Sequence, residues 1–496
     1  MTVRVTPWGR DDFKATSEDA QKKDWAYWQN QMNRASLIML TEEGIIDSAT
    51  AASIAKAQLR AEQIQAEPGR ERLTDIMPLE RLLIEACGEK ATLIHTGRSR
   101  QDMFTTLNQA RLRLAFLDWF EAFVKMRERL LSIAQENIDT YVPAYTNGVQ
   151  AMPVTLGFYL WGFLESFERD ADRFLEAYRR VNQSALGVAV LACSSWPLNR
   201  ERLSELLGFE APLTNGLDAA QISLFDIPLE AASIAANVAI RIGVLVQDLA
   251  QQYSQTRPWI LLDTSAAYGS SAMPQKRNPG ILNKTRGVAS DVVGAMQTSF
   301  LRAHNLQLGM YDNKESVLED CSGVFVKSVE MLILTEQAFS QMKVNPERGL
   351  EELNSDWTST MSLAEGLQRQ FGVPFRVGHT FASSIVTFAR SHNLRPDNFP
   401  FEEAKRLFSE VTEKLEGKKE TLILSEADFR TLLSPQHAVQ SSVGAGAPNS
   451  ESTRAGLNRI GLRLIADKEA LKQKRLNLSE ADKKREEAFL KLVNLS

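Results

Sequence analysis

The sequence is poor in the two residues that make most tight turns. It contains 27 glycines and 17 prolines among 496 residues, about 9% where average usage gives about 12%. An all-β sandwich or barrel of this length needs many tight turns, which are made mainly with Gly, Pro, Asn and Asp. The composition therefore disfavours an all-β fold, excludes collagen-like and low-complexity chains, and predicts a mostly α-helical protein with long elements.

Cysteine and histidine are also rare. The chain has three cysteines, Cys87, Cys193 and Cys321, and five histidines. The odd number and wide spacing of the cysteines argue against a disulfide framework. The chain also lacks the CxxC and HExxH motifs that indicate a zinc site. We interpret the cysteines as small buried apolar residues of a protein in the reducing cytoplasm.

Neither sign of charge is in large excess. With 57 Lys and Arg against 62 Asp and Glu, the net charge is −5. No basic stripe indicates nucleic acid as a partner, and no polybasic segment indicates a membrane surface. The start of the chain, MTVRVTPWGRDDFK, lacks the apolar core of a signal peptide.

Helical patterns cover most of the chain. We expect several helices over residues 17–83, with Ser17 as an N-cap and another helix start at Thr41, followed by helices over 102–136, 155–181, 229–252, 282–305 and 316–342. In the segment 229–252 the three charged residues, Glu230, Arg241 and Asp248, are separated by close to three and two full turns, so they share one narrow stripe. This pattern predicts a helix buried on most sides of a bundle. It does not predict a membrane span, because no uncharged apolar run reaches about 18 residues.

The C-terminal third changes in character. It has shorter helical patterns, more loops and a Gly/Ser stretch over 441–450, and the highly charged segment from Leu471 onward predicts a solvated helix. The length is compatible with about three domains. We predict an N-terminal helical domain over 1–110, a central long-helix bundle over 111–360 and a C-terminal helical domain over 361–496.

Three islands interrupt the helical patterns. The first, 95–102, places Ser99, Arg100 and Gln101 just before a helix, where backbone N–H groups and an arginine can bind a carboxylate; the alternative is a solvated basic loop with a helix cap. The second, 145–153, contains Thr146 and Asn147, and by itself it is also compatible with an ordinary Asn-Gly turn.

The third island, 269–279, reads GSSAMPQKRNP. Its small residues allow a mobile loop that closes over a ligand. A plain Ser/Gly connector has no need of the Met-Pro-Gln-Lys-Arg-Asn-Pro run.

This third island resembles the signature loop GSSxMPxKxNP of the aspartase/fumarase superfamily. The first island resembles the HTARSRND motif of argininosuccinate lyases, and the second falls where that family has a Thr-His-Leu-Gln segment. The resemblance implies a three-domain, mostly α-helical subunit whose long helices form a 20-helix bundle in a homotetramer. It also implies active sites shared among three subunits, no metal or organic cofactor, and cleavage of a C–N or C–O bond of a succinyl group to release fumarate.

The resemblance also implies roles for individual residues. Ser270 aligns with the general base, and Lys276 and Asn278 align with the groups that stabilise the doubly charged aci-carboxylate intermediate. The remaining expected substrate-binding residues are Ser99, Arg100, Gln101, Thr146, Ser271, Met273, Tyr311 and Lys314.

The chain departs from the family pattern in a coherent way. Asn147 stands where the family has a histidine, and Asn283 stands where the glutamate that pairs with this histidine is expected. The family's QEDK segment is Tyr311-Asp-Asn-Lys314 here. The fumarate half of the site is thus largely kept, while the half that binds the amine is rebuilt, with Asn147 retained as a candidate catalytic residue.

We therefore predict a carbon–nitrogen lyase that acts on an N-substituted aspartate other than argininosuccinate, comparable to lyases of aminopolycarboxylates such as ethylenediamine disuccinate. Three alternatives stay open at this point. They are a true argininosuccinate lyase, a catalytically silent structural protein like the lens crystallins of this family, and another superfamily chemistry such as adenylosuccinate or carboxymuconate processing.

Overall fold

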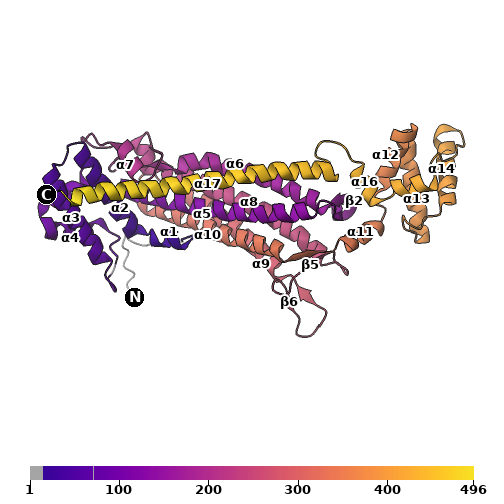
Figure 1. Cartoon of the computed structure of the whole chain (residues 1–496), viewed down its shortest axis with the longest axis horizontal. Coiled ribbons are helices and arrows are strands. Elements are labelled where there is room, and N and C mark those ends of the chain that lie inside the picture. Colours follow the sequence, from indigo (N-terminus) through magenta and orange to yellow (C-terminus); the bar gives the residue numbers. More distant parts are fainter. Residues whose placement is uncertain (1–14, 71, 496) are drawn as a thin grey trace.

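The protein is an elongated assembly of long helices (Figure 1). The computed structural model describes residues 15–70 and 72–495, without the side chains of residues 311–313. The N-terminal helices lie at one end and a group of short helices from the C-terminal third lies at the other. The mostly α-helical fold predicted from the sequence is confirmed.

The helices differ greatly in length. They are α1 (Glu18–Lys22), α2 (Trp25–Glu42), α3 (Ser48–Gln65), α4 (Ile76–Cys87), η1 (Glu89–His95), α5 (Arg100–Glu136), α6 (Leu156–Val181), α7 (Arg200–Leu206), η2 (Asp218–Ile222), α8 (Ser223–Tyr253), α9 (Gly280–Ala303), α10 (Tyr311–Ser340), α11 (Pro346–Asn354), α12 (Thr360–Phe371), α13 (Phe375–His392), α14 (Phe401–Glu416), α15 (Glu426–Leu432), α16 (Pro435–Gln440) and α17 (Ser450–Val493).

Within the described residues, the strands are short and form four two-stranded sheets. They are β1 (Tyr141–Thr146) with β2 (Val149–Thr155), β3 (Gln183–Ser184) with β4 (Ala211–Pro212), β5 (Ile260–Leu262) with β8 (Met342–Val344), and β6 (Tyr268–Gly269) with β7 (Arg277–Asn278).

Long helices α5, α6, α8, α9 and α10 pack side by side around the largest hydrophobic cluster. Aromatic rings fill its centre: Phe120 and Phe174 stack with their ring centroids 3.7 Å apart, and Trp119 stacks on Phe123 at 5.1 Å. The indole N–H of Trp119 donates to the hydroxyl of Ser328, 2.9 Å away, so this buried polar atom is paired.

The charged stripe of α8 faces α6. Glu230 accepts from Arg180 at 2.7 Å, Arg241 pairs with Asp170, and Asp248 accepts from the hydroxyl of Tyr159 at 2.5 Å. By length and composition, Asp218–Tyr253 could cross a membrane, yet 56% of its most apolar window is buried inside the protein. The predicted charge stripe therefore joins α8 to a neighbouring helix of the bundle.

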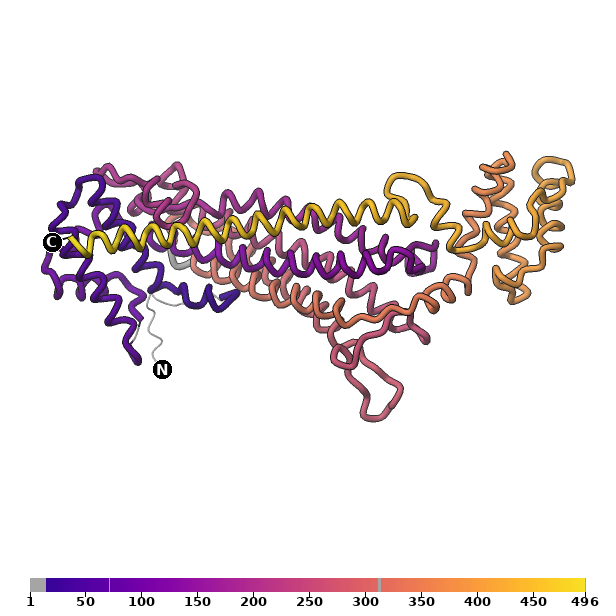
Figure 2. Tube along the Cα trace, in the orientation of Figure 1, coloured from indigo at the N-terminus to yellow at the C-terminus, as the bar shows by residue number. Residues whose placement is uncertain are grey.

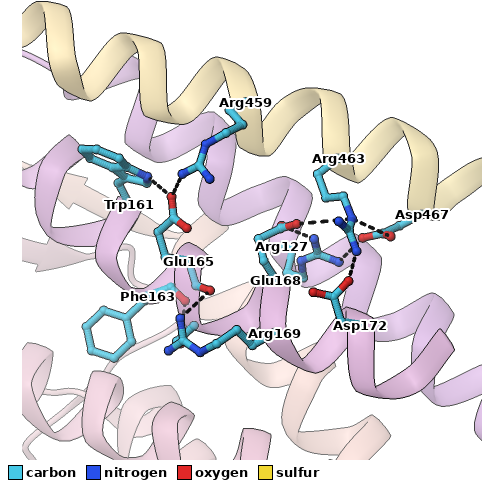
Figure 3. Close-up of polar contacts among 11 residues, drawn as sticks. Arg127, Trp161, Phe163, Glu165, Glu168, Arg169, Asp172, Arg459, Arg463 and Asp467 are labelled. Carbon is cyan, nitrogen blue, oxygen red and sulfur yellow. Dashed lines mark hydrogen bonds and ion pairs between the residues drawn. The ribbon is translucent and has the colours of Figure 1, made fainter. Parts of the chain in front are cut away.

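Helix α17 returns along the whole bundle to the N-terminal helices (Figures 1 and 2). Arg127 of α5, which is 1% exposed, donates to Asp467 of α17 at 2.8 Å and pairs with Glu168 of α6; Figure 3 shows this network. At Gly456 a Cβ atom would lie 2.2 Å from the indole of Trp161, so only glycine permits this close approach.

The structure corrects several sequence predictions. Thr41 does not start a helix; it lies in the last turn of α2, because Gly44 at φ 69° ends that helix and Asp47 caps the next. The longest helix, α17, lies in the third of the chain for which we expected shorter helices. Its charged end is helical as predicted, but Phe489 and Leu492 are buried, so it is only partly solvated. Cys193 is exposed, against the expectation of a buried thiol.

The core of the described part of the chain divides into three hydrophobic clusters. One joins the N-terminal helices to the start of α5 and the end of α17, one fills the central bundle, and one lies within residues 357–433. The domain boundaries near 110 and 360 stay predictions, and the first fourteen residues, with the segment compared to a signal peptide, lie outside the described part.

Candidate functional site

The first island forms the N-terminus of α5. Gly97 adopts φ 68°, and Ser99 is the N-cap, whose Oγ accepts from the backbone N–H of Gln101 at 3.2 Å. The N–H of Ser99 donates in return to Asp102 Oδ1 at 2.9 Å, which completes a capping box. The cap we gave as the alternative interpretation is thus present. It fixes Ser99 and Arg100 at a helix N-terminus, where anions are stabilised.

The side chains of Arg100 and Gln101 already have protein partners. Arg100 pairs with Asp75, the N-cap of α4, with 3.1 Å between Nη2 and Oδ1. The side-chain amide of Gln101 donates to the carbonyl of Ala220 in η2, 2.9 Å away. Gln101 thus joins the start of α5 to the start of α8.

Lys314 lies near the same end of the bundle, on the first turn of α10. Its ammonium is fully buried, donates to the side-chain oxygen of Gln221 in η2, and lies 5.5 Å from the ring centroid of Phe225. Burial lowers the pKa of Lys314 to about 8. Tyr311 begins α10, but its side chain is outside the described part of the structure.

The second island is a β-hairpin at the opposite end of α5. Asn147 and Gly148 have φ of 51° and 78°, as in the two-residue Asn-Gly turns that suit hairpins. Thr146 and Asn147 are both exposed at its tip. The Asn-Gly turn of the alternative interpretation is therefore present, and it exposes both candidate residues to solvent.

The third island is a loop closed by the short β6–β7 pair, and it projects from the side of the bundle (Figure 1). The Oγ of Ser270 accepts from the backbone N–H groups of Ala272, at 3.2 Å, and Met273, at 3.1 Å. The amide of Asn278 donates to the carbonyl of Tyr268 at 3.2 Å. The side chains of Ser271, Met273 and Lys276 are exposed, and so is Asn283 in the first turn of α9.

A single chain does not bring the three islands together. Helix α5, of 37 residues, separates the first island from the second by about 55 Å at 1.5 Å per residue. Helix α8, of 31 residues, separates Gln221, beside Lys314, from the segment leading to Ser270 by about 46 Å. The structure joins only the first island and Lys314, through η2, and leaves the hairpin and the serine loop far from them.

Sequence reasoning missed three features near the first island. They are the buried carboxylate of Asp102, the side chain of Gln221, and the loop over 187–198 that packs on Gly97. The capping-box spacing of Ser99 and Asp102 was a usable signal for the first. The other two depend on contacts across more than eighty residues, which no local pattern reports.

The described residues include no group of three or more His, Cys, Asp or Glu side chains that could hold a metal ion.

Comparisons of the sequence with family models and with known proteins both point to lyases. A family model described as lyase matches residues 17–294, and one described as argininosuccinate lyase C-terminal matches residues 357–440. The chain is 31% identical to the argininosuccinate lyase of Natronomonas pharaonis, over 92% of this chain and 89% of the relative. It is also 31% identical to that of Methanosarcina mazei, over 86% and 84%.

Solved structures share the fold. A crystal structure of EDDS lyase in complex with formate covers 97% of both chains with a TM-score of 0.82 at 24% identity. A class II fumarase from Schistosoma mansoni covers 83% of this chain and 90% of its own with a TM-score of 0.63 at 16% identity. At these identities, the likeness concerns the fold alone.

Proposed function

The chain belongs to the argininosuccinate lyase family of the aspartase/fumarase superfamily and is a carbon–nitrogen lyase, and from this we propose that it cleaves an N-substituted aspartate other than argininosuccinate to fumarate and an amine. The observation that carries the proposal is the contrast within the site. Ser270, Lys276 and Asn278 are retained, whereas Asn147 and Asn283 replace a histidine and a glutamate that are expected to act as a pair.

In the proposed reaction, Ser270 takes a proton from the carbon beside one carboxylate of the substrate. The electron pair of that C–H bond moves into the carboxylate to give the aci-carboxylate, which Lys276 and Asn278 stabilise. The pair then forms the C=C bond of fumarate while the C–N bond breaks and the amine leaves with the bonding electrons. A nitrogen that already carries an extra proton leaves as the neutral amine, so this step needs no histidine as proton donor.

The environment of Ser270 supports its role as base. A free serine is a weak base, and its alkoxide must be stabilised before it can accept a proton from carbon. The two backbone N–H groups that donate to its Oγ, from Ala272 and Met273, provide part of this stabilisation. Closure of the loop over the substrate would exclude water and strengthen both hydrogen bonds.

The separation of the islands supports a site assembled from several subunits. We propose a homotetramer in which the N-terminus of α5, the hairpin and the serine loop that form one site come from different chains. The central helices also expose large apolar side chains that a subunit contact would cover: Ile240 and Val244 on α8, Phe300 and Leu301 on α9, and Ile333 on α10. Exposed apolar groups of this kind mark association surfaces when they are contiguous.

The amine half of the site supports a substrate other than argininosuccinate. Asn147 lies at the exposed tip of a turn whose backbone suits asparagine at positive φ, and it cannot supply the proton that a histidine could. A relative of the same fold is named EDDS lyase. We therefore include diamines and amino acids among the candidate leaving groups.

The test is an adduct search in the synthetic direction. The purified protein is incubated with fumarate and a panel of amines, diamines and amino acids, and the products are identified by mass spectrometry. We expect an N-substituted aspartate from at least one amine and loss of this product in Ser270→Ala. A product that persists in this variant would remove Ser270 as the base.

Argininosuccinate is tested beside the panel. Release of fumarate from argininosuccinate at the rate of a dedicated lyase would contradict the rebuilt amine site and favour a true argininosuccinate lyase. No adduct with any amine, and no fumarate from N-substituted aspartates, would contradict the proposal and favour a silent protein of the crystallin kind.

A further inference from the structure

Asp102 is a buried carboxylate that the proposed reaction does not use. Its side chain is fully buried in the first turn of α5, two residues after Arg100. One oxygen, Oδ1, accepts from the N–H of Ser99 at 2.9 Å. The other, Oδ2, accepts from the N–H groups of Gly187, at 2.9 Å, and Ala189, at 3.1 Å. The carboxylate thus joins the helix cap to a loop 85 positions away in the chain.

That loop, over 187–198, is held in an unfavourable backbone conformation. Ala189 and Cys193 have φ of 52° and 61°, a region that L-residues other than Asn and Asp rarely adopt. The other described residues with positive φ are all asparagine or glycine. Strain of this kind persists where surrounding contacts over-determine the backbone, and it clusters at functional sites.

The loop also packs directly on the first island at its other end. A Cβ atom at Gly97 would lie 2.6 Å from Leu198 Cδ1 and 3.1 Å from Ser194 Oγ, so the loop lies directly against this glycine, whose φ of 68° also favours glycine. Between its two anchored ends, the loop presents Val190, which is 58% exposed, and Trp196, which is 50% exposed. The loop that contacts Gly97 and Asp102 of the first island therefore carries two exposed large apolar side chains.

Two arginines face the carboxylate. Arg98, in the turn before α5, is partly buried and donates to Asn33 and Ser36 of α2, and Arg200 of α7 donates to the carbonyls of Leu186 and Leu213. Both act on Asp102 through their charge without a direct hydrogen bond to it. Their positive charges favour the ionised carboxyl, which is the form that accepts three N–H bonds.

We propose that Asp102 is a positioning residue that clamps the loop over 187–198 onto the N-terminus of α5, so that the loop forms one wall of the substrate site beside Ser99 and Arg100. The wall function rests on the proposed lyase function, whereas the clamp does not. An apolar wall at this place selects amines with an apolar or aromatic part, with Trp196 as the contacting side chain.

The clamp is tested with Asp102→Asn in the full-length protein. Asparagine has a single acceptor oxygen, and its NH₂ group would face N–H donors, so one of the two connections must be lost. We expect hydrogen exchange in peptides covering 187–198 to accelerate about 10-fold or more, with little change elsewhere. The matched control is Asp170→Asn, another fully buried aspartate, which pairs with Arg173 and Arg241 on the bundle. It should leave exchange in the loop unchanged.

The wall is tested by fumarate binding and by substrate choice. In Asp102→Asn, we expect the dissociation constant of fumarate to rise about 10-fold, because small displacements of positioning groups have large effects. Trp196→Ala should leave fumarate binding unchanged and lower kcat/KM more for bulky apolar amines than for small ones. Loss of this preference identifies a specificity residue, an effect that general destabilisation would not produce.

The outcomes separate the clamp from the proposed function. Unchanged loop exchange in Asp102→Asn would overturn the clamp, whatever the activity. Faster exchange with unchanged fumarate affinity would overturn the wall. If the wild-type protein binds no fumarate and forms no adduct, the proposed function and the wall fail together, while the exchange experiment still decides the clamp.

Discussion

The proposed assembly of the site from several subunits gives a quantitative prediction. Arg100 lies beside Gln101, which contacts η2 at the start of α8, whereas the serine loop follows the other end of α8, a helix of 31 residues that is about 46 Å long. Helices of this length are rigid in a packed bundle, so the two groups of one chain cannot meet on one substrate. Arg100→Ala and Ser270→Ala should therefore each be inactive alone and complement each other when mixed.

The expected recovery follows from random mixing. In a tetramer formed from equal amounts of the two variants, a working site needs Arg100 from one chain and Ser270 from another. Each condition is met half of the time, so activity should return to about a quarter of the wild-type value for a closed symmetric oligomer. The assay is fumarate release or adduct formation after co-expression of differently tagged chains, with mixed oligomers verified by native mass spectrometry.

The control uses two changes within one island. Ser99→Ala and Arg100→Ala lie at the same helix N-terminus, so sites built from their mixture always lack one of them and should show no recovery. Activity that stays at the level of the inactive parents in verified mixtures of Arg100→Ala and Ser270→Ala would refute the shared site. It would require a conformation that brings both groups of one chain together.

Three further predictions concern stability and pH. Arg127→Met should lower the free energy of unfolding by about 3–5 kcal/mol, because it removes the direct partner of the buried Asp467 and leaves only the longer ion pair with Arg463. An unchanged urea midpoint would show that Arg127 does not secure α17. Gly456→Ala should lower the free energy of unfolding by about 1–3 kcal/mol, because the added methyl group overpacks against Trp161. An unchanged melting temperature would contradict the close approach of Gly456 to Trp161. Burial raises the pKa of Asp102 to about 6 from 3.8, so the folded chain takes up a proton below pH 6 that the unfolded chain takes up only near pH 4. The KM should therefore rise as the pH falls through 6. Over the same pH range, the contribution of Asp102 to the free energy of unfolding increases. If the rise in KM persists in Asp102→Asn, its assignment to Asp102 is wrong.

The helical fold could be predicted because its causes are local. The scarcity of glycine and proline, the spacing of apolar residues and the cap at Ser17 act over a few residues, and the structure contains the corresponding helices. The charge stripe of α8 also followed from helix periodicity, although the sequence could not name α6 as its partner.

Tertiary packing determined what local patterns could not report. The charged composition of the last segment gave no sign that α17 would return along the bundle and bury Asp467 against Arg127. The helix start expected at Thr41 was wrong because the positive φ of Gly44 overrides a favourable run of residues.

For the candidate site, the sequence by itself determined which residues are present and the three islands that carry them. Residue types and spacing singled out the islands, and the resemblance to a known family implied the roles of Ser270, Arg100 and Asn147. Only the tertiary structure decided that these islands lie apart in one chain and that Asp102 joins the first of them to a distant loop. The physical reason is that rigid helices set the distances between groups, and a buried carboxylate must accept hydrogen bonds from whichever N–H groups the fold brings to it.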